Sequence, residues 1–234
     1  MPRRGVSLSK GARAGIVLIS FAAAIGLILF GIFGYLRSSP DVVTATQSTS
    51  QPNTVNLVMQ VDGAVGVGAH PNWVGYWVQD ANGVWHQTTL VKVPVNTNVH
   101  VTVYEYDSGG ALRNPEWAKV SGVLGGQVNL NGTEDAIVNP NSPGNGIAHT
   151  FVIPGLNVTV PLYGVNGSVK NFCQTGPCNL SEAHTTTSFA FFSGSSVHSY
   201  HWQCFVPCGL GYLEGNGGPM QSLGNMAGFF EVVK

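Results

Sequence analysis

Charged residues are scarce in this sequence of 234 residues. Asp, Glu, Lys and Arg together make up 9% of it, against roughly 25% in an average globular protein. Half of the ten basic residues lie within the first 37 positions. From Asp62 onward there are five basic and ten acidic residues, a net charge of −5 with His neutral. Because nucleic-acid binding needs clustered cations, this balance argues against nucleic acid as a partner and suits a basic protein instead.

The sequence also lacks the motifs of common enzyme classes. It contains no nucleophile elbow, no paired-histidine metalloprotease motif and no phosphate-binding glycine loop placed before a helix. Beyond the first 36 residues no segment shows a convincing helical period of apolar residues, and no repeat of fixed length appears. Hydrolytic chemistry is therefore not expected, and a stand-alone enzyme is not the favoured interpretation.

One long apolar run stands near the N-terminus. Residues 14–36 contain no charged side chain, and as a helix at about 1.5 Å per residue they would cross the roughly 30 Å core of a bilayer. Four basic residues precede the run and only Arg37 follows it closely. The positive-inside rule then predicts a single-pass protein of the cell membrane with a cytoplasmic N-terminus, residues 1–13. A cleaved signal peptide is the alternative, but its apolar core is usually only about 7–15 residues long.

The rest of the chain divides into a linker and a domain. Residues 38–56 are polar and rich in Ser and Thr, which is typical of a flexible linker. Residues 57–234 are numerous enough for one domain with a substantial core. Since they follow the predicted anchor, we expect this domain to be extracytoplasmic.

Short segments of alternating apolar residues fill the domain, separated by turn residues. The clearest is residues 98–107, NVHVTVYEYD, in which valine occupies alternate positions. We expect further strands at residues 56–61, 88–93, 149–154, 158–162, 185–192, 199–204 and 229–233. Residues 108–145 are rich in Gly and Asn and are expected to be a long excursion. The pattern predicts an all-β sandwich or barrel.

The four cysteines are Cys173, Cys178, Cys204 and Cys208, all beyond the apolar run. In an oxidising compartment an even number suggests two disulfides, with three possible connectivities. Cys173 and Cys178 flank a Gly-Pro turn, which favours a small loop closed by a disulfide. Cys204 and Cys208 are then either metal thiolates or a second disulfide, and cross-pairing with the first two cysteines is also open.

The order of several segments carries a resemblance to a known family. A valine-rich strand precedes His149 in HTFVIPGLNVTVPL, and an aromatic strand ends at Cys204 in YHWQC. A methionine-containing loop and a last strand GFFEVV close the chain. This order resembles a cupredoxin domain over residues 88–234. Residues 203–209, QCFVPCG, resemble the loop of the CuA domain in subunit II of heme-copper oxidases, where two cysteines bridge two copper ions. The resemblance implies a cupredoxin-like Greek-key β-sandwich, here preceded by a single transmembrane helix.

The same resemblance implies a copper site formed by His149, Cys204, Cys208 and Met220. Copper that alternates between +1 and +2 favours thiolate, imidazole and thioether ligands. Strand alternation places the side chains of His149 and Cys204 toward the interior of the sandwich. The main-chain carbonyl of Val206 lies where the family uses one as a weak ligand.

The ligand set also departs from the family pattern. Tyr212 stands where the CuA pattern has a second histidine, and Gly215 stands where it has a methionine. A full CuA centre is therefore not expected, which leaves a modified copper site or a scaffold without metal. Of the remaining histidines, His184 would reach the site only if its loop folded over it, and His201 is expected at the surface.

Three functions stay open on this basis. The first is an electron-transfer module that passes electrons from an external donor protein to a membrane oxidase. The second is a metal-free structural subunit docked on a membrane complex. The aromatic residues 73–77 would then be a candidate contact surface, although a place in the buried core is the favoured interpretation of these residues. The third is a copper carrier, which would tolerate an incomplete ligand set because it must release its metal.

Overall fold

The computed structural model describes residues 9–35, 40–135, 146–209 and 217–234. It divides the chain into two compact units, Met1–Ser39 and Pro40–Lys234, which are described separately.

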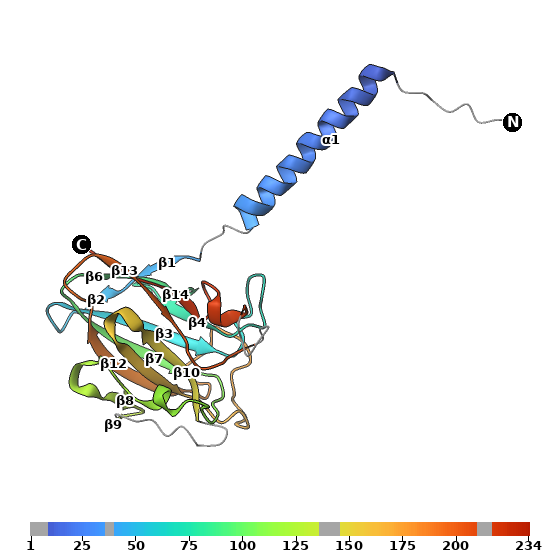
Figure 1. Cartoon of the computed structure of the whole chain (residues 1–234). Coiled ribbons are helices and arrows are strands. Elements are labelled where there is room, and N and C mark those ends of the chain that lie inside the picture. The colour runs from blue at the N-terminus through green and yellow to red at the C-terminus, as the bar shows by residue number, and fades with distance from the viewer. Residues whose placement is uncertain (1–8, 36–39, 136–145, 210–216) are drawn as a thin grey trace. The chain divides into compact units, whose positions relative to one another are not determined.

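The first unit contains one helix, α1 (Lys10–Phe30), continued by a short π-helical turn, η1 (Gly31–Tyr35) (Figure 1). The helix begins four residues earlier than the apolar run predicts, because the Ser9 side chain accepts a hydrogen bond from the Ala12 amide and caps it. Its apolar side chains are not buried against other residues. The segment Lys10–Phe33 is long and apolar enough to cross a membrane, a property that it shares with signal sequences. Leu36 and Arg37 lie outside the described residues.

The second unit consists of two β-sheets (Figure 1). The first sheet has the strand order β1-β6-β14-β13-β10-β11, and the second has β5-β4-β3-β7-β12-β8-β9 with β2 paired to β3. The strands of the first sheet are β1 (Val42–Thr44), β6 (Leu90–Pro94), β10 (Ile147–Ile153), β11 (Val158–Tyr163), β13 (His198–Gln203) and β14 (Ala227–Val233). Those of the second are β2 (Thr46–Gln47), β3 (Thr54–Asp62), β4 (Gly75–Gln79), β5 (Trp85–Gln87), β7 (Asn98–Glu105), β8 (Val128–Leu130), β9 (Thr133–Asp135) and β12 (Thr185–Phe192).

The core lies between the two sheets. Strand β7 shows why the sequence folds this way: Val99, Val101 and Val103 are fully buried, and His100 on the opposite face is exposed. β7 pairs in parallel with β3 and antiparallel with β12, whose Phe189 and Phe191 join the same core. The predicted class, a β-sandwich preceded by one helix, is confirmed.

The structure differs from the sequence-based boundaries at the N-terminal edge of the domain. Residues 42–47, assigned above to the linker, form β1 and β2, and β3 already begins at Thr54. β1 pairs in parallel with β6 and buries Val43. A strand of three residues contributes a single buried side chain. Such a short segment shows no recognisable alternation of apolar and polar residues in the sequence.

The aromatic residues 73–77 also differ from the role that one hypothesis gives them. Tyr76 and Trp77 belong to β4 and are buried, so they do not form an exposed contact surface. Within the predicted excursion, the short strands β8 and β9 extend the second sheet beyond β12.

A disulfide joins Cys173 and Cys178, as the sequence predicts. Two hydrogen bonds attach the loop that it closes to β3 and to the segment that follows β3. The Gly176 amide donates to the Ala64 carbonyl over 2.8 Å, and the Cys178 amide donates to Gln60 Oε1 over 2.7 Å.

Replacing both Cys173 and Cys178 by serine is expected to lower the free energy of unfolding by about 2 kcal/mol, because the closed loop is short. Thermal unfolding of the full-length chain in detergent, followed by circular dichroism, measures the change. An unaltered midpoint would show that the disulfide does not constrain the chain.

Candidate metal centre

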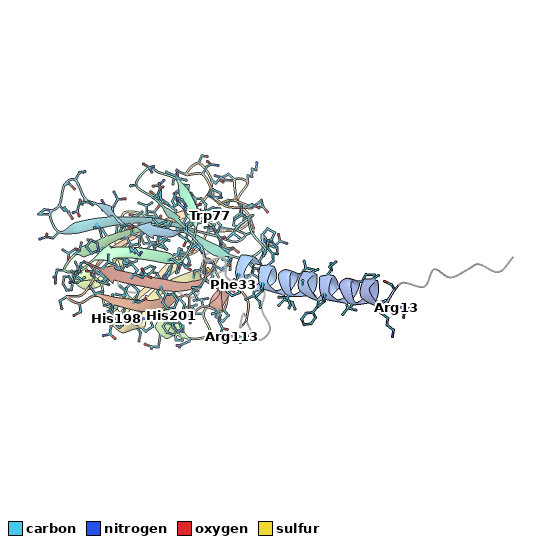
Figure 2. The ribbon with its side chains drawn as sticks, turned by 90° about the horizontal axis from the view of Figure 1, so that it is seen from above. Arg13, Phe33, Trp77, Arg113, His198 and His201 are labelled. Carbon is cyan, nitrogen blue, oxygen red and sulfur yellow. A yellow bond between two sulfur atoms is a disulfide. The ribbon has the colours of Figure 1, made fainter. Side chains whose placement is uncertain are left out.

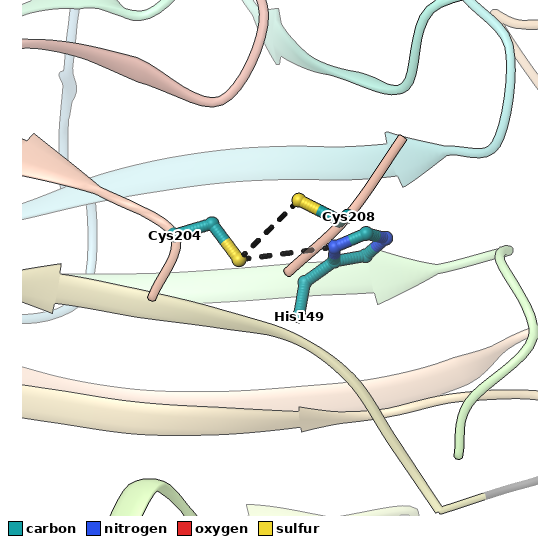
Figure 3. A group of neighbouring side chains, drawn as sticks. All are labelled: His149, Cys204 and Cys208. Atoms are coloured by element: carbon teal, nitrogen blue, oxygen red, sulfur yellow. Dashed lines mark hydrogen bonds between the residues drawn. The ribbon is translucent and has the colours of Figure 1, made fainter. Parts of the chain in front are cut away.

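Three side chains from separate parts of the sequence meet in one buried cluster (Figure 3). His149 lies on β10, Cys204 directly follows the neighbouring strand β13, and Cys208 lies in the loop beyond. The Sγ atom of Cys204 is 3.9 Å from Nδ1 of His149 and 3.7 Å from Sγ of Cys208. All three residues are buried. The predicted meeting of one imidazole with two thiols is therefore what the structure shows.

The backbone explains how these ligands are brought together. The pairing of β10 with β11 shifts between Ile147 and His149, and such irregularities re-aim side chains next to functional sites. The Cys204 amide donates to the Met226 carbonyl over 2.9 Å, which holds the end of β13 against the start of β14. The loop after Cys208 turns at Gly209, with φ of +73° and the Pro219 ring so close that no side chain fits there.

Three further polar groups surround the Cys204 sulfur: the Thr150 amide, the Thr150 hydroxyl, which lies 3.8 Å away, and the Val206 carbonyl. The Thr150 amide donates to Sγ over 3.4 Å, and the Val206 carbonyl oxygen lies at the same distance from it. The Thr150 hydroxyl oxygen also accepts a hydrogen bond from the Phe205 amide over 2.8 Å. The Val206 carbonyl thus lies beside the sulfur, and its role as a weak ligand, which the family resemblance implies, stays a prediction.

Cys204 and Cys208 are both free thiols, so the second disulfide considered above is absent. Burial opposes ionisation of Cys204, but the hydrogen bond from Cys208 and the adjacent His149 hold the pKa of its thiol well below the usual value. The pKa of Cys208 is raised instead, first because it donates that hydrogen bond and then because it is buried. Cys204 is therefore the thiolate of the pair.

Asp107 orients the histidine. Its Oδ2 is 3.2 Å from Nε2 of His149, so the ring presents Nδ1 to Cys204 and to any bound metal ion. Burial alone would raise the pKa of Asp107, but the hydrogen bond from His149 holds it below the usual value. A carboxylate behind a ligating histidine is the usual arrangement in metal sites.

Glu105 is a second buried carboxyl near this site. It is fully buried on the core-facing side of β7, and burial raises its pKa well above the usual value. Its Oε1 accepts a hydrogen bond from the Asp107 amide over 2.9 Å. Neither residue was predicted from the sequence as part of the site. The sequence did contain a signal for both. Glu105 and Asp107 continue the series of alternate positions that valine occupies in residues 98–107, and this series faces the core.

Met220 remains a prediction. It lies on the short helix η5 (Pro219–Gln221) and packs, partly buried, against the core cluster that contains Cys204 and Cys208. Tyr212 and Gly215, which replace family ligands, lie outside the described residues.

His184, His198 and His201 are not part of the cluster. His184 packs against the rings of Tyr104 and Tyr106, with centroid separations of 5.4 and 5.2 Å. His198 and His201 lie on β13 and are exposed (Figure 2). Among the described residues, His149 is the one histidine grouped with cysteines in a possible metal site.

The donor set fits copper. Two sulfurs and one imidazole nitrogen are soft to borderline ligands, which match a metal that alternates between Cu(I) and Cu(II). The Val206 carbonyl beside Cys204 is a harder oxygen donor and could serve only as a weak additional ligand. All three side chains are held on a folded β-framework and are buried from water.

Comparisons with known proteins give similarity at the level of solved structures alone. No family model and no curated protein match the sequence. A structure described as the copper protein rusticyanin is 14% identical, with 84% of this chain and 86% of that chain covered and a TM-score of 0.33. Rusticyanin from Thiobacillus ferrooxidans is also 14% identical, over 84% and 85% of the two chains, with a TM-score of 0.33. Reduced rusticyanin gives 14% identity, 84% and 87% coverage and a TM-score of 0.32.

Proposed function

We propose that this protein is a membrane-tethered copper protein of the cupredoxin type that transfers single electrons. The observation that carries the proposal is the buried cluster of His149, Cys204 and Cys208. When bound there, copper would supply one-electron exchange between its +1 and +2 states.

The residues around the cluster are suited to that task. His149 is fixed by Asp107, and Cys204 by the Thr150 amide and by its own backbone bond to Met226. Ligands held by packed strands keep nearly the same positions in both oxidation states, so little reorganisation is needed when an electron arrives. The low pKa of the Cys204 thiol provides the thiolate that a copper ion requires.

Topology and charge suggest where the protein works. An uncleaved N-terminal helix with basic residues before it would place the domain on the outer side of the cell membrane. The net charge of −5 from Asp62 onward favours a basic donor protein. A respiratory oxidase in the same membrane is the proposed acceptor, in line with the resemblance of QCFVPCG to subunit II.

Anaerobic titration of the reduced full-length chain in detergent with Cu(II) tests the proposal. We expect visible thiolate-to-copper absorption that disappears on reduction and returns on oxidation. Colourless binding of Cu(I) alone would indicate a copper carrier instead. Four blocked thiols in the native, non-reduced protein, together with no bound copper, would indicate a structural subunit.

Asp107→Asn is expected to weaken copper binding by roughly 10–100-fold, since loss of the carboxylate behind a ligating histidine typically costs that much. Competition with a chelator of known affinity measures the change. Asp80→Asn, at an acidic residue on the Asp80–Gly83 turn next to β4, is the control and should bind copper as the wild type does. Equal affinities for both variants would show that Asp107 does not position His149.

A further inference from the structure

A pair of aromatic rings lies beside the cysteine loop. Phe205 directly follows Cys204, and its ring stacks on Trp117 with the centroids 4.7 Å apart and the planes 23° from parallel. Trp117 belongs to the short helix η2 (Pro115–Ala118), within the segment predicted to be an excursion. Both rings are half-buried, so each has one part at the surface. The stack therefore connects solvent with the residue adjacent to the thiolate.

The surrounding surface is open to a partner. A groove of about 350 Å³ lies beside the same loop and is lined by Val206 and Pro207. Its other walls are residues 108–113, which lead toward η2, and Ile147 and Ala148, which precede His149. The segments next to Asp107, to His149 and to the two cysteines of the cluster thus all reach the surface at this groove.

The other indoles are less suited to connect the cluster with solvent. Trp202 is on the same strand as the cysteine but is fully buried, and Trp77 is also buried. Trp85 is partly exposed but lies on β5, at the far edge of the second sheet from β7. Trp73 is also partly exposed, but its ring stacks on His70, with the centroids 3.8 Å apart.

We infer that Trp117 is the residue through which an electron enters, passing by way of the Phe205 ring and the peptide chain to Cys204. The inference rests on the proposed electron-transfer function. Tunnelling weakens less along covalent bonds than across space, and this route has a single non-covalent step, the stacked ring contact. One electron leaves a reduced outer-sphere donor and reduces Cu(II) held by Cys204 to Cu(I). No bond forms or breaks, and no proton moves.

Stopped-flow reduction of the copper-loaded full-length chain by hexaammineruthenium(II) tests the route. Trp117→Leu is expected to lower the second-order rate constant about tenfold, equivalent to about 1.4 kcal/mol of activation free energy. Trp117→Phe keeps a stacked ring and should stay close to the wild type. Trp85→Leu removes a partly exposed indole elsewhere and should leave the rate unchanged.

A second measurement separates electron entry from simple shielding of the site. If Trp117 only covered the cysteines, Trp117→Leu would accelerate alkylation of Cys204 and Cys208 in the metal-free chain, and that result would overturn the inference. We expect unchanged alkylation and an unchanged visible spectrum. A wild-type reduction rate in a Trp117→Leu protein that retains its visible absorption would also overturn it. Failure of the wild-type chain to bind copper would instead contradict the proposed function.

Discussion

Replacement of Cys204 by serine is expected to abolish visible thiolate-to-copper absorption in the full-length chain. It should also weaken copper binding by more than roughly 10–100-fold. That range is the typical cost of removing a residue that only hydrogen-bonds to a ligand, whereas Cys204 would be a ligand itself. Cys204 is in contact with every other member of the cluster: its sulfur faces His149, Cys208, the Thr150 amide and the Val206 carbonyl. A serine hydroxyl at this position would be a hard, protonated ligand where copper prefers a thiolate.

Cys208→Ser should have a smaller effect than Cys204→Ser. Cys208 donates its hydrogen bond to Cys204 and has a raised pKa, whereas the pKa of Cys204 is lowered. The single variant at Cys208 therefore retains the more acidic thiol next to His149. We expect it to keep a visible absorption band, at a shifted wavelength.

The two variants can be compared with a matched control. The double serine variant at Cys173 and Cys178 also removes two sulfurs, but from the disulfide rather than from the cluster. It should retain the visible band of the wild type. If Cys204→Ser kept that band, or if Cys208→Ser lost it while Cys204→Ser did not, Cys204 would not be the principal thiolate.

The cluster could be predicted because the alternation of residues along a strand shows which side chains point into the core. His149 and Cys204 each belong to, or directly follow, a regular strand whose apolar partners are buried, so their inward orientation follows from parity. Parity also predicts β7 and β12 nearly to the residue. It could not predict β1 and β2, which are two or three residues long and depend on pairing with β6 and β3. Trp117 was missed because the segment that contains the short helix η2 has no periodic pattern of apolar residues from which its position could be predicted.

Asp62 shows a different limit of sequence reasoning. It is the last residue of β3 and belongs to the face that points away from the core, where an acidic residue normally meets water. The loop closed by Cys173 and Cys178 covers it, and a side chain at Gly176 would collide with Asp62 Oδ2 and Trp77 Nε1. Neither carboxyl oxygen has a hydrogen-bond partner among the described residues. Only the tertiary position of that loop makes Asp62 a buried acid.

Asp62→Asn is expected to remove a large part of the pH dependence of stability. Burial, together with the nearby charges of Glu182 and Asp107, raises the pKa of Asp62 from 3.8 to about 8 in the folded chain. Between these two values the folded chain holds a proton that the unfolded chain releases, so the free energy of unfolding falls as pH rises. At about 1.4 kcal/mol per pH unit, the loss attributable to Asp62 approaches roughly 5 kcal/mol between about pH 4 and pH 8. Below the unfolded pKa of 3.8 both states are protonated and the full contribution of Asp62 is present.

Chemical denaturation of the full-length chain in detergent, with a copper chelator present, measures this effect at about pH 4, 6 and 8. Because other buried acids such as Glu105 titrate as well, the informative quantity is the difference in unfolding free energy between the wild type and Asp62→Asn at each pH. That difference should shift in favour of the Asp62→Asn variant as pH rises, because an amide carries no proton to release. Glu134→Gln, at an exposed glutamate on β9, is the control and should run parallel to the wild type. If the wild type and Asp62→Asn lost stability equally over this range, the Asp62 carboxyl would be ionised in the fold and the disulfide loop would not seal it from water.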